Sequence, residues 1–303
     1  MRKIITAMLA AFMTIASLTA CAGSGEQGLT LSDENFVIKD GVLRSYNGSE
    51  GEVEIPEGVT AVGQLAFPDC KVLTHVEIPN TVKSIDNDAF WGCENLESIT
   101  LPDSITTIGN CAFYGCESLL SITIPESVTV IGPSVFGSCV SLSEVTLPDS
   151  IKSIVDGAFH DCYSLESIVI PDSVKSIGEY TFNNCYALQN IVIPKRVKSI
   201  SNGVFQNCYS LKSIVIPNGV KSIGEKAFNG CESLQSIVIP DSVKSIGEDA
   251  FYDCESLQSI VIPDKVKSIG EDAFYDCESI EITYKGTEYT YDTLDDLYKA
   301  ING

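Results

Sequence analysis

Basic residues are scarce in this sequence. Its 303 residues include 19 Lys and Arg against 41 Asp and Glu, a formal net charge of −22 at pH 7. Affinity for nucleic-acid phosphates requires clustered Lys and Arg. We therefore expect no nucleic-acid partner, and the acidic surface favours solubility and basic partners.

Histidine is nearly absent as well. His75 and His160 are the only two, and they lie in unrelated repeats, so no pair of nucleophile and base is expected. No CxxC, EF-hand or nonapeptide calcium repeat occurs. Acidic groups such as Glu248 and Asp249 are expected on a solvated face. The sequence predicts a protein that is not an enzyme and that needs no cofactor or metal.

The first twenty residues resemble a targeting segment. Arg2 and Lys3 precede an apolar run from Ile4 to Leu18, which is too short to span a bilayer comfortably. The run ends Leu-Thr-Ala-Cys, which resembles a bacterial lipobox with Cys21 as the lipidated residue. We predict a lipoprotein signal peptide at 1–20, with ordinary signal cleavage as the alternative. A flexible tether follows at 21–30.

A fixed period of 23 residues organises the rest of the chain. Prolines keep this step from Pro56 to Pro263, and ten phenylalanines keep it from Phe67 to Phe274. Ten cysteines keep it from Cys70 to Cys277. Such a period is typical of a solenoid, in which each unit buries its apolar face against the next. We predict one solenoid domain.

The copy from Pro240 to Ile262 shows the expected coil. Its last three residues, Ile-Val-Ile, alternate before the next proline and predict a strand. Val243 and Ile246 predict a second, shorter strand, and Gly247 predicts a tight bend. Glu248–Cys254 has the spacing of one helical turn.

The ends of the array should be closed by caps, because the last coils would otherwise expose apolar side chains and strand edges. Asp40-Gly41 lies between two alternating runs and predicts a hairpin, within an N-terminal cap at 31–55. The repeats are expected at 56–279. A C-terminal cap at 280–303 is expected to hold a small helix from Asp292 to Ile301.

The repeated phrase LxSIxIPxxVxxIGxxAFxxC resembles that of the BspA-like leucine-rich repeat family, and the opening FVIKDGVLRSYNG and ending ITYKGT fit it too. Asp86, Val155 and Ser201 depart from it by replacing the bend glycine. The resemblance implies a right-handed parallel β-solenoid displayed on bacterial surfaces, often linked to adhesion to host or neighbouring-cell proteins. It implies no catalytic residue.

The cysteine column has three possible roles. Exported proteins use regular cysteines for disulfides or metals. Stacked coils would bring successive Cα atoms within disulfide range, but parallel Cβ vectors fit the required torsion badly. We therefore expect the thiols to be small buried hydrophobes, while the leucine and phenylalanine columns form ladders in the core.

Three surface columns are candidate binding sites. The outward position of the main strand is Glu77, Thr100, Thr123 and Thr146, and then Val169, Val192, Val215, Val238 and Val261. This valine stripe either marks an interaction site or stabilises neighbouring strands. Tyr163, Tyr186 and Tyr209 could stack on a sugar or on a partner's side chain. A lysine column, Lys152, Lys175, Lys198, Lys221, Lys244 and Lys267, either is neutralised by the acidic rows beside it or binds an anionic ligand.

These features favour a lipid-anchored surface protein, exposed outside the cytoplasm, whose repeats bind extracellular host or bacterial proteins and serve adhesion. Repetition supports this hypothesis, since weak contacts from several equivalent coils add by avidity. A carbohydrate or mucin-glycan binding module is one alternative, and a passive surface spacer is another. The membrane is expected to be contacted only through the lipid on Cys21.

Overall fold

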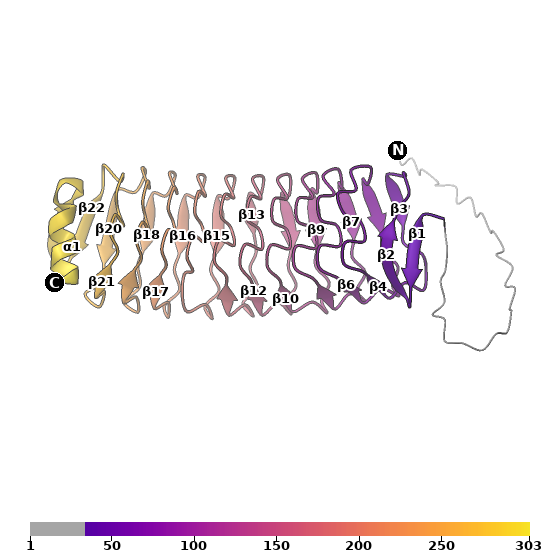
Figure 1. The fold of residues 1–303 in the computed structure, drawn as a ribbon. Helices are drawn as coiled ribbons and strands as arrows, with labels where there is room; N and C mark the ends of the chain where they lie inside the picture. The colour runs from indigo at the N-terminus through magenta and orange to yellow at the C-terminus, as the bar shows by residue number, and fades with distance from the viewer. Residues whose placement is uncertain (1–33) are drawn as a thin grey trace, which may run out of the picture.

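Each 23-residue repeat forms one coil of an elongated β-solenoid in the computed structural model, which describes residues 34–303 (Figure 1). A hairpin lies at the N-terminal end of the stack and a helix at the C-terminal end. The predicted fold class is confirmed. The predicted signal peptide, Cys21 and the tether lie outside the described residues.

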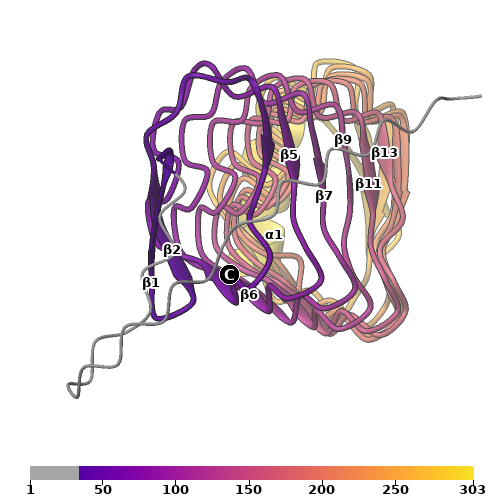
Figure 2. The ribbon, with the colours of Figure 1, turned by 90° about the vertical axis from the view of Figure 1, so that its right-hand side faces the viewer.

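The longer strand of every coil contributes to one wall of the solenoid. Most neighbouring strands pair in parallel, one repeat apart, so that Ser213 lies opposite Ser236 and Ile214 opposite Ile237. Figure 2 shows several of these strands along one side of the coils. The strands of this wall are β3 (Glu52–Glu54), β5 (His75–Glu77), β7 (Ser98–Thr100), β9 (Ser121–Thr123), β11 (Glu144–Thr146), β13 (Ser167–Ile168), β15 (Asn190–Val192), β16 (Ser213–Val215), β18 (Ser236–Val238), β20 (Ser259–Ile262) and β22 (Glu281–Tyr284).

A second wall is made by two-residue strands that follow the prolines. Most of them also pair in parallel, as Ile246 with Ile269, and Ile200 continues the row by a single bridge to Ile223. The strands of this wall are β4 (Ala61–Val62), β6 (Ser84–Ile85), β8 (Thr107–Ile108), β10 (Val130–Ile131), β12 (Ser153–Ile154), β14 (Ser176–Ile177), β17 (Ser222–Ile223), β19 (Ser245–Ile246) and β21 (Ser268–Ile269).

Phenylalanine rings form a continuous ladder in the core. From Phe67 to Phe274 all ten rings are fully buried, with successive centroids 4.9–5.7 Å apart and interplanar angles of 2–17°. The predicted ladder is confirmed. Because each aromatic side chain buries a large apolar area, this column is a main source of stability between coils.

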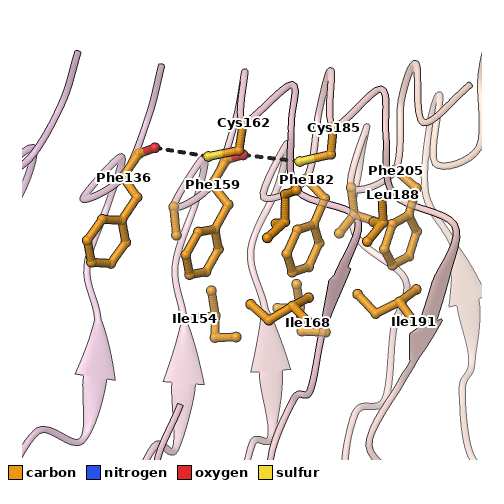
Figure 3. Close-up of a cluster of buried hydrophobic side chains, with 14 of the residues drawn as sticks. Phe136, Ile154, Phe159, Cys162, Ile168, Phe182, Cys185, Leu188, Ile191 and Phe205 are labelled. Carbon is orange, nitrogen blue, oxygen red and sulfur yellow. Dashed lines mark hydrogen bonds between the residues drawn. The ribbon is translucent and has the colours of Figure 1, made fainter. Parts of the chain in front are cut away.

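The cysteine column lies beside this ladder as free thiols. The Cys162 Sγ donates to the Phe136 carbonyl at 3.2 Å, and the Cys185 Sγ donates to the Phe159 carbonyl at 3.3 Å (Figure 3). All eleven cysteines among residues 34–303 are unpaired, and those from Cys93 to Cys277 in the column are buried. The expectation of buried, unpaired thiols is confirmed for every member of the column except the partly exposed Cys70. Each buried thiol of the column also donates a hydrogen bond to the coil before it.

The segment predicted as one helical turn consists of two hydrogen-bonded turns instead. In one copy the Asn229 amide bonds the Lys226 carbonyl and the Cys231 amide bonds the Phe228 carbonyl. Left-handed residues interrupt any helix, as Asp249 and Asp253 do in another copy, with φ of 53° and 57°. The amides of this segment bond the next coil, as Phe251 does with the Ala273 carbonyl at 2.8 Å.

The bend glycine is required for close approach between coils. Gly247 does not have a positive φ. A Cβ atom there would lie 2.5 Å from the Glu225 amide nitrogen and 2.6 Å from the Gly224 carbonyl carbon. The reason predicted from the sequence, freedom for a tight bend, is therefore replaced by a steric one.

Both ends of the array are closed. At the N-terminus β1 (Phe36–Lys39) pairs antiparallel with β2 (Val42–Tyr46), and β2 joins β4 in parallel. The Tyr46 ring packs on Phe67 at 5.3 Å. The predicted hairpin is confirmed, and it covers the first ring of the ladder.

The C-terminal end is built from a second hairpin and the helix. β22 pairs antiparallel with β23 (Thr287–Thr290), a strand that the sequence reasoning missed. A 3-10 turn, η1 (Tyr291–Thr293), leads into α1 (Leu294–Asn302), which buries Leu294, Leu297 and Ile301. The predicted closing helix is confirmed.

Candidate binding face

The five outward valines form a continuous exposed ridge, which we call the valine ridge: Val169, Val192, Val215, Val238 and Val261. Side chains alternate across a strand, so Ile191 and Ile193 are buried while Val192 points to solvent. Val192, Val215 and Val238 lie directly opposite one another in three adjacent strands. The five side chains are 64–81% exposed. Mutual contact therefore covers only a minor part of this apolar surface.

Shallow hollows follow the valine ridge. One of about 520 Å³ is lined by Val169 and Val192 together with Asp149 and Asp172. Another of about 770 Å³ lies beside Val238 and is lined by Lys221, Lys244 and Lys265 among other residues. We call the second one the lysine hollow.

Lys265 was missed by sequence reasoning. It lies two residues before Lys267 of the column and lines the lysine hollow. The sequence feature that could have identified Lys265 is a departure from the repeat, since the residues from Pro263 read PDKV in place of PDSV. PKRV at Pro194 and PNGV at Pro217 are similar departures.

The three tyrosines form a stack on the turn that precedes the main strand. Their centroids are 4.6 Å apart for Tyr163 and Tyr186, and 4.8 Å apart for Tyr186 and Tyr209. Burial raises the pKa of Tyr209, and the adjacent Tyr186 and Glu232 add to the shift. Both faces of the Tyr186 ring are covered by its neighbours, so this ring offers a sugar only its edge.

The lysine column is exposed along its whole length. No ion pair within residues 34–303 includes any of its six members, so neutralisation through direct contact with the acidic rows, one of the two alternatives, is not observed. Lys198 instead donates its Nζ to the Lys195 carbonyl at 3.4 Å. These ammonium groups face solvent.

The histidines do have polar neighbours. The His75 Nδ1 lies 2.6 Å from the Ser98 Oγ, so the expectation that no nucleophile lies near a histidine is wrong for His75. The two are cross-strand neighbours in β5 and β7. No carboxylate within the described part of the chain forms a hydrogen bond with the His75 ring. His160 contacts Asp161 at 3.0 Å. The His75–Ser98 contact thus lacks the group that would orient the base.

Residues 34–303 contain neither a candidate metal cluster nor a candidate membrane span. No group of three or more His, Cys, Asp or Glu side chains is arranged there to hold a metal ion. Within the same residues, no helix has the length and apolar character needed to cross a membrane.

Several solved structures resemble this chain. A leucine-rich repeat protein from Bacteroides ovatus is 31% identical over 86% of this chain and 87% of that chain, with a TM-score of 0.49. A leucine rich cell surface protein from Faecalibacterium prausnitzii is 28% identical over 90% and 97%, with a TM-score of 0.44. The pneumococcal vaccine antigen PcpA is 20% identical over 87% and 89%, with a TM-score of 0.52, and shows the fold alone.

The repeats themselves match a known family. A comparison with curated protein sequences gives no match. The model of the BspA type leucine rich repeat region matches in six copies, over residues 44–165 and 152–281. The chain therefore belongs to the BspA-type leucine-rich repeat family, whose solenoid is a scaffold for interaction with other proteins and is typically not an enzyme.

Proposed function

We propose that this protein is a non-enzymatic bacterial surface scaffold that binds extracellular proteins through the valine ridge and serves adhesion to host or neighbouring cells. The observation that carries the proposal is the exposure of five aligned valines, 64–81% each, along one wall of the solenoid. A contiguous exposed apolar surface of this kind often marks an interaction site.

The dimensions of the ridge suit a protein partner. Four spacings of about 4.8 Å between parallel strands give a ridge of roughly 19 Å. Val192, Val215 and Val238 lie in hydrogen-bonded strands, so their backbones are already ordered before binding. A partner then loses little free energy to ordering of the scaffold. Equivalent contacts from several coils add by avidity.

Lipid anchoring at Cys21 is the second part of the proposal. It rests on the lipobox-like sequence after an apolar run and on the family of surface proteins to which the repeats belong. Cys21→Ser should release the protein from the membrane fraction of the producing cell, with metabolic incorporation of a labelled fatty acid as the readout. Label retained in the Cys21→Ser protein would contradict the assignment.

The ridge is tested by V192D/V215D/V238D in the body that follows Cys21. Retention on immobilised host and bacterial surface proteins should fall by about tenfold or more, since three charges would enter an apolar contact. T100D/T123D/T146D is the matched control, because it places three aspartates in the same column of the other half of the array. Equal loss in both variants, or in neither, would contradict a role for the ridge. Circular dichroism checks that both fold.

The glycan alternative has its own arm of this experiment. Tyr163 and Tyr209 are 40% and 37% exposed, which keeps the two end rings of the stack accessible. If Y163A/Y186A/Y209A abolishes capture of immobilised mucin glycans and the ridge variant does not, the protein is a glycan binder. Capture of neither proteins nor glycans by the parent protein would make it a passive spacer.

A further inference from the structure

We infer that the partner of the valine ridge presents an acidic protein segment, whose carboxylates lie over the lysine hollow while its apolar side chains cover the adjacent valines. This inference rests on the proposed function of the ridge. It specifies the chemistry of the partner, which the exposure of the valines alone does not.

The first observation is a local charge that opposes the charge of the whole chain. The protein has a formal net charge of −22, yet the lysine hollow is lined by three lysines and one acidic residue, Asp241. None of the ion pairs formed among residues 34–303 includes these three lysines. An anionic group entering the hollow would therefore displace no existing partner.

The second observation is where the repeat departs from its pattern. The residue after the proline is acidic at Asp172 and Asp241, but in the two coils between them it is Lys195 and Asn218. The residue that follows changes from serine to Arg196 and Gly219 in the same two coils. These changes remove two carboxylates and add two cations along the edge of the ridge.

Gly219 also affects the position of a nearby ammonium group. It lines the lysine hollow, and a Cβ atom built on it would lie 3.1 Å from the Lys198 Nζ. With φ of 145°, this position strongly favours glycine. The glycine thus leaves space for Lys198 at the rim of the hollow.

The third observation is a change of charge along the ridge. The hollow beside Val169 and Val192 is lined by Asp149 and Asp172 and contains no lysine, whereas the one beside Val238 is lysine-rich. A bound segment would therefore be oriented, with its carboxylates toward the C-terminal end of the ridge.

The position of the valines favours a protein segment over an anionic polysaccharide. Val238 lines the same hollow as Lys221, Lys244 and Lys265. A sulfated sugar chain would pair with the lysines but leave the apolar ridge exposed. A segment that carries both carboxylates and aliphatic side chains would use both features at once.

Three fluorescent or labelled probes test the inference by anisotropy with the body that follows Cys21. The first is a synthetic peptide of alternating glutamate and valine, the second has lysine in place of every glutamate, and the third is heparin. The glutamate peptide should bind more tightly than either of the others. Absence of its binding, or tighter binding of the lysine peptide or of heparin, overturns the inference.

Two variants separate this inference from the proposed function. K221Q/K244Q/K265Q should weaken binding of the glutamate peptide by about tenfold, the sum of three exposed ion pairs. K39Q/K71Q/K299Q, with the same change in net charge elsewhere on the surface, should leave it unchanged. V192S/V215S/V238S should weaken binding of the peptide as well.

The pattern of losses shows which claim fails. If only the serine variant loses affinity, the ridge binds but the acidic partner is wrong. If only the hollow variant loses affinity, the ridge itself is not the binding surface, and the proposed function fails with the inference. Equal losses in the hollow variant and its charge-matched control would show a general electrostatic effect and overturn the inference alone.

Discussion

The hydroxyl group of Tyr298 accepts a hydrogen bond from the Phe274 amide at 3.3 Å. In the preceding coil the equivalent amide, that of Phe251, donates to the Ala273 carbonyl of the next coil at 2.8 Å. Phe274 belongs to the last coil, so a side chain of α1 replaces the missing backbone acceptor. Asn302 does the same for Ile269, bonding its amide at 3.0 Å and its carbonyl at 2.9 Å. The helix thus satisfies the polar edge of the array as well as covering its apolar end.

Tyr298→Phe should lower the free energy of unfolding by about 1–3 kcal/mol, since it leaves a buried amide without an acceptor. Urea denaturation followed by circular dichroism measures the change. Tyr275→Phe is the control, because the Tyr275 ring is 45% exposed and its hydroxyl group caps no coil. A change no larger than that of the control would contradict the capping role.

The phenylalanine ladder should be the most sensitive part of the core. Phe182→Ala removes a ring stacked at 5.7 Å on both neighbours and should cost about 3–5 kcal/mol. Tyr163→Ala, which removes an exposed ring of similar size, should cost much less. Urea midpoints of the two variants make the comparison, and similar losses would refute the importance of the ladder.

Glycine at the bend should be required only where the preceding coil comes close. Gly247→Ala places a methyl group against the backbone of Glu225 and Gly224 and should destabilise the fold by about 1–3 kcal/mol. Gly132→Ala is the control, because its nearest neighbour is the Asn110 side-chain oxygen at 3.0 Å, which can move. Thermal melts of equal midpoint would argue against this steric explanation.

Much of the coil could be predicted from the sequence, because proline, phenylalanine and cysteine recur at one period and stacked coils can only bring equivalent positions together. The helical turn was predicted wrongly. Spacing of Ala250, Phe251 and Cys254 suits a helix, but left-handed backbone at Asp249 and Asp253 cannot be inferred from apolar spacing. β23 was missed although Lys285-Gly286, with φ of 48° and 76°, is a hairpin turn of the same kind as Asp40-Gly41.

The candidate face was predicted in part. Alternation along the strand correctly predicted that Val215 and its equivalents point outward. The hollow beside Val238 was not predicted, because it depends on how the loop after the strand packs against the neighbouring coils. The stacking of the tyrosines followed from the period, but the covering of both faces of Tyr186 became clear only from ring distances.

Buried thiols should make the protein sensitive to alkaline pH. Burial raises the pKa of Cys93 and of Cys139 to about 12, from an ordinary value of 9.0. Because the pKa of these thiols is higher in the folded chain than in the unfolded chain, they stabilise the fold fully below about pH 9. This stabilisation is lost as the pH rises from there toward 12. The urea concentration at the unfolding midpoint should therefore decrease as the pH is raised from 8 to 10. The decrease should exceed the one caused by titration of the tyrosines and lysines alone.

Cys139→Ala tests the origin of this pH dependence. It should flatten the dependence of unfolding free energy on pH by about 1.4 kcal/mol per pH unit, the contribution of one proton. Cys111→Ala, at a partly exposed thiol outside the column, should change the slope less. An unchanged slope in the Cys139 variant would show that the column does not titrate in the unfolded chain as expected.

The regular parallel register has an evolutionary consequence. Because Ile191 pairs with Ile214 as Ile214 pairs with Ile237, one internal coil presents almost the same bonding groups as another. Unequal recombination between two copies would then insert or delete a whole coil while keeping both terminal closures intact. Length could change in steps of about 4.8 Å, so the span of the solenoid can evolve without redesign of its ends.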